Sequence, residues 1–368
     1  MRGVATALPV AFYGISAMIY SYFGSVLFPG DTAGFLLFLS YSILIVSLIT
    51  GPLICLCDKE HRNASRHHHQ HHHQGTNVNV LSPSVSIEMR SLTSTPLQSK
   101  TATPIPIELN NSECSPLQLL TRLDFWLSTT ILALLAGLGQ MYIYSVGYIV
   151  TSLFGDLQYI QDNYQNYKVL VQQEQQLQVS IISIASCSGR LVSGFLADIF
   201  SNRFKLPRIV LLLVATSLAI ASQVLGYYFN KLNQIVLTSA LTGFAYGFTY
   251  CIFPILVGDL WGLANFSSNW GIVNMSPIIT NTLLTVYFGE IYDSHLTEYK
   301  INKTKPTSDK PAETTLLEYC DLKEKCYNKV FESSFLVALL ATTLAIFLSY
   351  YHIRKERKRI SKTFTFED

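Results

Sequence analysis

The sequence predicts an all-α polytopic membrane protein, a bundle of about eight transmembrane helices. Nearly half of the residues are hydrophobic, only 14% are charged and the mean hydropathy is positive, a balance that soluble globular chains rarely show. The apolar residues gather into runs long enough to cross a hydrocarbon core of about 30 Å, and they do not alternate as barrel strands do. The runs lie at residues 5–27, 33–57, 125–154, 177–200, 208–229, 235–258, 269–292 and 331–352.

The first two expected spans lie within residues 1–57 and begin almost at Met1. The first apolar run is too long for the core of a signal peptide and has no small-residue cleavage site. We therefore expect it to remain in the protein as a membrane helix.

Residues 58–120 break the hydrophobic pattern. Ser, Thr, Pro, Asn and Gln dominate, aromatic residues vanish and no apolar period remains, which predicts a disordered cytoplasmic linker rich in His, Ser and Thr. Its run RHHHQHHHQ, residues 66–74, contains imidazoles that suit zinc or nickel, but a tandem run fixes no coordination geometry. We interpret the run as a low-complexity tract and expect neither a metal site nor a cofactor.

The other six spans form a C-terminal half at residues 121–353, followed by a basic tail at 354–368. Lys and Arg residues near the spans set the orientation, because they favour the cytoplasmic side. They gather on one side of the predicted membrane, at Arg2, in residues 58–122, at Arg203, Lys205 and Arg208, and in the run RKERKR at 354–359. Both termini are therefore expected in the cytoplasm, and the long loop at 294–330 on the opposite side.

The loop at 294–330 has two features of an extracytoplasmic segment. Cys320 and Cys326 are the only cysteines on that side, where an oxidising compartment favours a disulfide over two free thiols. Asn302 begins an Asn-Lys-Thr sequence, which this topology makes a usable glycosylation site.

The span at 177–200 contains charges, and a charge at mid-bilayer costs about 2.5–3.5 kcal/mol. Arg190, Gly194 and Asp198 recur every four residues and so share one helical face. Asp198 lies at the cytoplasmic mouth, where headgroups could solvate it, and Arg190 lies two turns deeper. We interpret Arg190 as an anion contact, against the alternative that it snorkels or pairs with a helix carbonyl.

Polar side chains on three other spans converge on the expected depth of Arg190. Gln140 and Tyr144 follow helical spacing in one span, and Tyr246 does so in a second. In the third, polar residues surround Pro277, whose missing N–H would kink the helix. The candidate substrate-binding set is Arg190, Gln140, Tyr144, Tyr246, Asn274 and Asn281. For each residue taken singly, hydrogen bonding between helices is the alternative role.

Catalytic and nucleic-acid signatures are absent from the sequence. It contains no G-x-S-x-G, P-loop or H-E-x-x-H motif, and its net charge of +2 is too small to argue for nucleic acid. We expect a protein that is not an enzyme, with a lipid bilayer and a small-molecule substrate as its partners.

The stretch GRLVSGFLADIFSNR, residues 189–203, resembles the loop motif of the major facilitator superfamily. Gly194, Asp198 and Arg203 fall on matching positions, whereas Ile199 and Ser201 depart from a basic residue and a glycine of the motif. Together with LTGFAYGFTYCIFPILVGDLWG, NWGIVNMSPIITNTLLTVYFGEIYD and CDLKEKCY, the stretch is similar to the fungal monocarboxylate-transporter-homologue branch, related to nodulin-like transporters.

The resemblance implies a twelve-helix fold of two six-helix halves joined by a long cytoplasmic loop. This chain would then lack the first four helices, and residues 1–57 would be the remnant of the N-terminal half. The resemblance also implies a secondary carrier that works by alternating access on a monocarboxylate or another organic anion. It favours the vacuolar membrane over the plasma membrane.

The resemblance also implies roles for single residues. Arg190 matches an arginine that binds the substrate carboxylate in monocarboxylate transporters. Ser186 stands where those carriers have an aspartate that assists proton coupling, so a coupling proton is not implied through this residue. Gly194, Asp198 and Arg203 would act in gating, with Asp198 accepting hydrogen bonds from the N-terminus of the helix at about residue 269 in one state.

Two other functions fit parts of the sequence. A non-transporting scaffold or sensor is compatible with the missing helices, and a metal carrier is compatible with the His run. The metal carrier is the weaker alternative, because the only histidine within the expected spans is His352, at the end of the last one.

Overall fold

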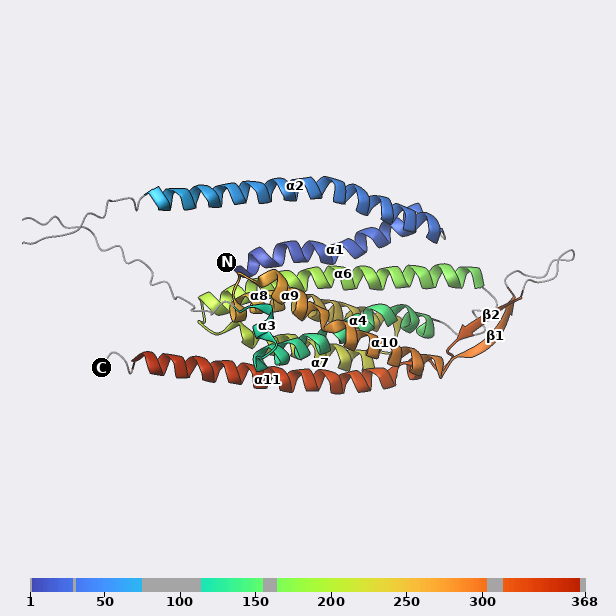
Figure 1. The fold of residues 1–368 in the computed structure, drawn as a ribbon. Coiled ribbons are helices and arrows are strands. Elements are labelled where there is room, and N and C mark those ends of the chain that lie inside the picture. Colours follow the sequence, from blue (N-terminus) through green and yellow to red (C-terminus); the bar gives the residue numbers. More distant parts are fainter. Residues whose placement is uncertain (1, 29–30, 75–113, 155–163, 303–313, 365–368) are drawn as a thin grey trace, which may run out of the picture. The chain divides into compact units, whose positions relative to one another are not determined.

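The computed structural model describes residues 2–28, 31–74, 114–154, 164–302 and 314–364. The chain divides into two compact units, a larger one of residues 1–23 and 110–368 and a smaller one of residues 24–109. Helices dominate both units (Figure 1). The elements of the larger unit are α1 (Arg2–Leu27, up to Phe23), α3 (Pro116–Leu119), α4 (Leu123–Leu153), α6 (Tyr164–Asn202), η1 (Arg208–Val210), α7 (Leu211–Tyr228), α8 (Leu232–Trp261), α9 (Phe266–Met275), α10 (Pro277–Asp293), β1 (Thr297–Asn302), β2 (Thr314–Tyr319), η2 (Lys323–Cys326) and α11 (Asn328–Phe364).

The smaller unit is built on α2 (Thr32–Gln74), which contains the apolar span Ala33–Leu56 with a mean hydropathy of 2.2. The helix begins where the Gly34 N–H donates to Asp31 Oδ1 at 3.0 Å, as in a side-chain N-cap. It continues past residue 58 into the segment expected to be a linker and ends with the His run at Gln74. The side chains of residues 57–74 and all of residues 75–113 lie outside the described residues.

Seven described helices, namely α1, α2, α4, α6, α7, α8 and α11, are long and apolar enough to cross a membrane. They confirm the prediction of an all-α polytopic membrane protein. The expected span at 269–292 is different, because it forms the two shorter helices α9 and α10. Ser276 between them keeps helical dihedrals of φ −61° and ψ −35°. Pro277 has no N–H to donate, so the helical hydrogen bonding lapses at this position.

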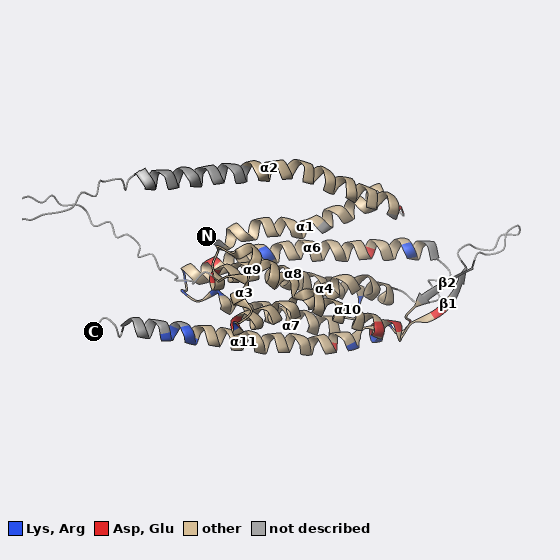
Figure 2. Cartoon of the chain, viewed as in Figure 1, with Lys and Arg blue, Asp and Glu red and all other residues tan. Residues whose placement is uncertain are grey.

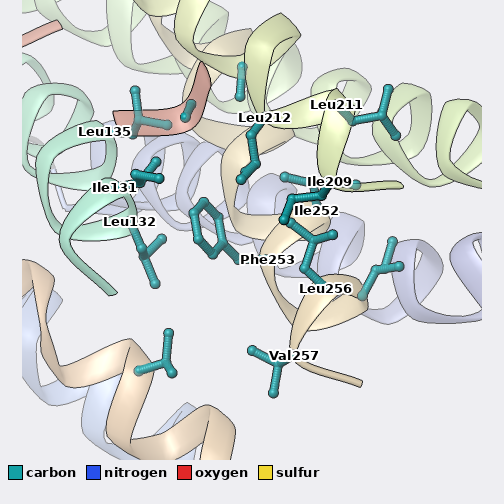
Figure 3. Packing of buried hydrophobic residues seen from close by; sticks show 14 of the residues in the cluster. Ile131, Leu132, Leu135, Ile209, Leu211, Leu212, Ile252, Phe253, Leu256 and Val257 are labelled. Carbon is teal, nitrogen blue, oxygen red and sulfur yellow. The ribbon is translucent and has the colours of Figure 1, made fainter. Parts of the chain in front are cut away.

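The main hydrophobic core of the larger unit lies between α4, α7 and α8 (Figure 3). Ile131 and Leu132 of α4 and Leu212 of α7 are fully buried, and Phe253 of α8 is 1% exposed. In lipid, apolar burial between helices gains little from leaving the solvent, so tight packing stabilises such a core.

Helices α6 and α8 pack closely through glycines. A Cβ atom at Gly189 of α6 or at Gly247 of α8 would collide with the backbone of the facing helix, at Phe244 and Ser186 respectively. Only glycine permits this separation, in agreement with the enrichment of small residues at membrane helix contacts. The glycines thus fix the position of the α6 segment that contains Arg190.

The segment between α10 and α11 forms a small structured cap. Strands β1 and β2 pair antiparallel, with Thr297 opposite Tyr319. Cys320 and Cys326 form a disulfide, and both sulfur-bearing residues are fully buried in a cluster that includes Tyr142 of α4. Burial raises the pKa of the neighbouring Tyr327 phenol well above its ordinary value, so this side chain stays neutral.

Candidate functional site

Arg190 lies inside the bundle, on the α6 face that meets α1. The residue is only 2% exposed. Its Nη1 donates to the carbonyl oxygen of Val10 at 2.9 Å, and the guanidinium carbon lies 5.3 Å from the centre of the Tyr13 ring, within cation–π range. Among the described residues Arg190 has no ion pair, and its buried Nε has no hydrogen-bond partner. The guanidinium is therefore a buried cation with unused hydrogen-bonding capacity.

Small residues of α1 allow the approach of Arg190. A Cβ atom at Gly14 would come within 2.6 Å of Arg190 Nη1. One turn closer to Asp198 in α6, a Cβ atom at Gly194 would meet the Ala7 side chain at 2.5 Å. The sequence prediction placed Gly194 in a gating motif, and in the structure this glycine permits close contact between α6 and α1.

Three of the predicted substrate-binding residues form one hydrogen-bonded wall. The Tyr246 hydroxyl donates to Gln140 Oε1 at 2.6 Å, and Gln140 Nε2 donates to the Tyr144 hydroxyl at 3.0 Å. Tyr246 also contacts Tyr250, with ring centres 4.7 Å apart. The wall joins α8 to α4, and its outer end is open because Tyr144 is 55% exposed.

Asn274 and Asn281 take no part in this wall within the described structure. Asn274 is exposed on α9. Asn281 on α10 accepts a hydrogen bond of 3.3 Å from Thr285, in its own helix. The backbone of Asn281 lies close to α4, because a Cβ atom at Gly137 would be 3.3 Å from its nitrogen. Helical spacing grouped these two asparagines with Arg190, but among the described residues neither is hydrogen-bonded to Arg190 or to the wall.

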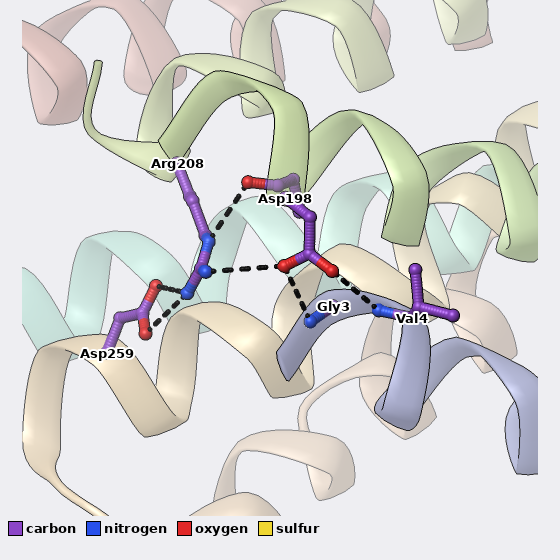
Figure 4. A network of polar contacts seen from close by, with 6 residues as sticks. Gly3, Val4, Asp198, Arg208 and Asp259 are labelled. Atoms are coloured by element: carbon purple, nitrogen blue, oxygen red, sulfur yellow. Dashed lines mark hydrogen bonds and ion pairs between the residues drawn. The ribbon is translucent and has the colours of Figure 1, made fainter. Parts of the chain in front are cut away.

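Asp198 caps the N-terminus of α1 (Figure 4). Its carboxylate accepts hydrogen bonds from the N–H groups of Gly3 at 3.0 Å and Val4 at 3.1 Å. A carboxylate is stabilised at this position by the unpaired N–H groups and the positive end of the helix dipole. In this structure the partner of Asp198 is therefore α1, and the expected contact with the helix beginning near residue 269 in one state stays a prediction.

Arg208 completes the network around Asp198 that Figure 4 shows. Its Nη1 donates to both oxygens of Asp259, at 2.9 and 2.8 Å, and its Nη2 lies 3.5 Å from Asp198 Oδ1. Its Nε also donates to the Ala197 carbonyl at 3.1 Å. The predicted gating residue Arg203 is exposed and has no ion pair among the described side chains. Sequence reasoning missed Arg208 and Asp259, since they lie on η1 and α8, far apart in the chain.

The remaining predicted sites lie in the cap. The structure joins Cys320 to Cys326, the pair singled out from the sequence. Asn302 is the last residue of β1; its side chain and the other residues of the glycosylation sequence lie outside the described residues. In the part of the chain that the structure describes, His, Cys, Asp and Glu side chains form no group of three or more that could hold a metal ion.

Comparisons with known proteins agree with this architecture. Residues 1–277 match the sequence profile of the Major Facilitator Superfamily. An uncharacterized membrane protein of Saccharomyces cerevisiae is 24% identical over 358 residues, which cover 80% of this chain and 64% of that protein. A probable transporter MCH1 of Neurospora crassa is 31% identical over 137 residues, or 32% of this chain and 23% of the relative.

A probable transporter MCH1 of Wickerhamomyces anomalus is 34% identical over 119 residues, which cover 32% of this chain and 24% of the relative. The chain thus spans less than two thirds of the length of the curated relatives it matches. The profile match extends over more than half of the chain and includes both Arg190 and the Asp198 network. The chain therefore belongs to the major facilitator superfamily, whose members are integral membrane transporters and not enzymes.

Proposed function

We propose that this protein belongs to a secondary carrier that moves a small organic anion, such as a monocarboxylate, and that Arg190 is the anion contact. The observation that carries the proposal is the burial of this guanidinium without an ion pair among the described residues. An unpaired charge in a membrane helix costs several kcal/mol, about 2.5–3.5 on insertion scales. A substrate that supplies the missing negative charge offsets that cost each time it binds.

The neighbouring groups suit a carboxylate in particular. The planar guanidinium can donate two parallel hydrogen bonds to the two oxygens of a carboxylate. Nη1, which now contacts the Val10 carbonyl, and the adjacent Nη2 form the pair of donors for this contact. Tyr246 and Gln140 supply further polar groups for the rest of a small solute. In this proposal the anion displaces the Val10 carbonyl from Arg190 and so loosens one contact between α6 and α1.

Asp198 and Arg208 would control a different step of transport, the opening of the cytoplasmic side. In the present arrangement they bind the N-terminus of α1 to α6, η1 and α8. Alternating access requires one set of helices to rock against another around a central site. We propose that these hydrogen bonds form when the cytoplasmic side is closed and break when it opens.

Proton coupling would need a group other than residue 186. Ser186 is 5% exposed, and a serine hydroxyl does not change its charge across the physiological pH range.

The chain also covers only part of its relatives' length, so transport is proposed for the twelve-helix protein of which these helices would form the C-terminal half and part of the N-terminal half. We further propose the vacuolar membrane as its location, with both termini in the cytoplasm and Asn302 glycosylated on the other side.

The test is uptake of radiolabelled monocarboxylates into proteoliposomes by the full-length form and its variants. Arg190→Gln is expected to reduce uptake at least ten-fold, because it removes a charge-assisted contact worth about 1.5–3 kcal/mol. Lys168→Gln, which changes an exposed cation on the same helix, is the matched control and is expected to leave uptake unchanged. Equal uptake by wild type and Arg190→Gln would remove the anion contact, and absence of uptake by any form would favour the scaffold or sensor alternative.

A further inference from the structure

We propose that the end of α11 is a binding surface for anionic phospholipids. The helix does not stop at the end of its membrane span at Lys355 but continues to Phe364. Its last described side chains include three exposed basic residues, Arg354, Arg357 and Lys358. None of the three has an ion pair with another described side chain.

The basic residues continue the exposed apolar stripe of the same helix. Large side chains at Leu340, Phe347 and Tyr351 are 51%, 50% and 37% exposed and recur at steps of seven and four residues. Arg354 and Lys358 follow Tyr351 at steps of three and four, so they lie on the same face. In a membrane this face contacts lipid tails, and its continuation reaches the lipid headgroups.

The aromatic residues mark the level of the headgroups. Tyr350 is 62% exposed beside Tyr351, and tyrosines favour the boundary between lipid and water. The Lys355 ammonium lies 5.8 Å from the centre of the Tyr351 ring, so its stem lies along the aromatic surface. The orientation of the protein requires basic residues at this end, but it does not require them to align with the lipid-facing stripe.

A neighbouring loop adds basic residues at the same end of the larger unit. Ser349 of α11 donates to the carbonyl of Ile209 at 3.5 Å, which places α11 beside η1. The loop before η1 contains the exposed residues Arg203 and Lys205. Figure 2 shows Lys and Arg segments both at this end of α11 and in that loop. Charge complementarity therefore identifies the occupant as the negatively charged headgroups of the adjoining leaflet.

The experiment counts lipids retained by the purified full chain, using native mass spectrometry with phosphatidylserine or phosphatidylcholine added. The triple variant Arg354→Gln, Arg357→Gln and Lys358→Gln is expected to weaken phosphatidylserine retention about five-fold for each residue changed, which corresponds to about 1 kcal/mol per basic side chain. Phosphatidylcholine retention is expected not to change. The matched control changes three exposed lysines to Gln, namely Lys323 and Lys325 of η2 and Lys329 in the first turn of α11.

Two results would overturn the proposal. Retention of phosphatidylserine unaffected by the triple variant would show that these side chains do not bind it. Displacement of phosphatidylserine by the same concentration of inorganic phosphate would show an anion site without a membrane role. Should the triple variant misfold, the wild-type chain still decides the question, because headgroup binding by exposed charges must weaken as salt is raised from 50 to 500 mM, about the range over which screening becomes strong.

A second and independent inference concerns a small, partly open cavity between α4, α7 and α8. The cavity has a volume of about 10 Å³, and its polar lining residues are Ser222, Gln223, Thr242, Tyr246 and Thr249. Gln223 is 1% exposed and Thr242 is 3% exposed. Gln223 Oε1 and Thr242 Oγ1 have no hydrogen-bond partner. This space holds about one water molecule, and a buried water needs at least two polar partners.

We infer that the cavity contains one ordered water, which donates to Gln223 Oε1 and exchanges a hydrogen bond with Thr242. Tyr246 forms part of the cavity wall and also donates to Gln140, so the water supports one end of the polar wall near Arg190. The proposal does not depend on which substrate the protein carries.

An experimental structure at a resolution that shows other buried waters tests this inference directly. Density between Gln223 and Thr242 is expected, and an empty cavity would contradict the inference. Melting temperatures give a second test. Thr242→Val and Gln223→Leu should each lower the melting temperature, because each leaves the other group unsatisfied, and the double variant should recover part of the loss. Strictly additive losses would argue against a shared water.

Discussion

At the scale of single residues, Arg190 illustrates how much a buried charge depends on its surroundings. Its guanidinium has one backbone hydrogen bond and one aromatic contact, both from α1. Their four-residue spacing placed Arg190, Gly194 and Asp198 on one helical face, and in the structure that face contacts α1. The contacts of Val10, Tyr13 and Gly14 with Arg190 were not predictable. Val10 contacts it through a backbone carbonyl and Gly14 through the absence of a side chain, and neither leaves a pattern in the sequence.

Gly14→Val is expected to weaken anion binding and lower stability. The added side chain would occupy the space of Arg190 Nη1, and insertion of methyl groups into a packed site typically costs about 1–3 kcal/mol. Gly289→Val is the matched control, because a Cβ atom there meets nothing within 4 Å. Anion affinity and thermal unfolding measured on both variants check the prediction, and equal effects of the two substitutions would contradict it.

At the scale of elements, the contact of α1 with α6 joins the two charged sites. Asp198 caps α1 at its first turn, and Arg190 contacts the same helix two turns further on. A rigid movement of α1 would therefore break both contacts together. The small residues Gly3, Ala7 and Gly194 make this contact close, since a Cβ atom at either glycine would collide with the facing helix.

Asp198→Asn is expected to destabilise the arrangement with α1 docked by about 1.5–3 kcal/mol, the range for hydrogen bonds to a charged group. The amide keeps one acceptor oxygen but loses the charge that favours the helix N-terminus and Arg208. Labelling rates of a cysteine introduced at Ala7, which is 1% exposed, measure the undocking. The rate should rise in Asp198→Asn and stay unchanged in Arg203→Gln, whose arginine is exposed; equal rates in the wild type and Asp198→Asn would remove the latch.

The disulfide of the cap stabilises a second contact between elements, that of the cap with α4. It closes a loop with a sequence separation of 6, which by chain entropy stabilises the folded state by about 2 kcal/mol. Because Cys320 and Cys326 pack in the same cluster as Tyr142 of α4, the paired change to serine should loosen the cap. Hydrogen exchange of β1 and β2 should accelerate in the double serine variant while α7 stays protected. Unchanged exchange in the strands would show that packing alone holds the cap.

At the scale of the whole molecule, hydrophobic runs were enough to predict the spans, because length and apolar content alone decide which segments can cross a bilayer. They could not show that the segment at 269–292 divides at Ser276, since the length of an apolar run does not depend on whether the helical hydrogen bonds continue through it. The partner of Asp198 and the network of Arg208 with Asp259 depend on tertiary packing between distant segments. For the same reason helical spacing could not show that Gln140, Tyr144 and Tyr246 are hydrogen-bonded to one another while Asn274 is exposed.

The most direct test of the proposed function compares binding of a small monocarboxylate with binding of its uncharged amide to the purified full-length form. Wild type is expected to bind the carboxylate at least ten-fold more tightly than the amide, because the buried charge of Arg190 strengthens a hydrogen bond to the carboxylate but gains little from the amide. Arg190→Gln is expected to lose that preference while Lys168→Gln keeps it. A wild type that binds the two compounds equally, or an Arg190→Gln variant that still prefers the carboxylate, would contradict the account.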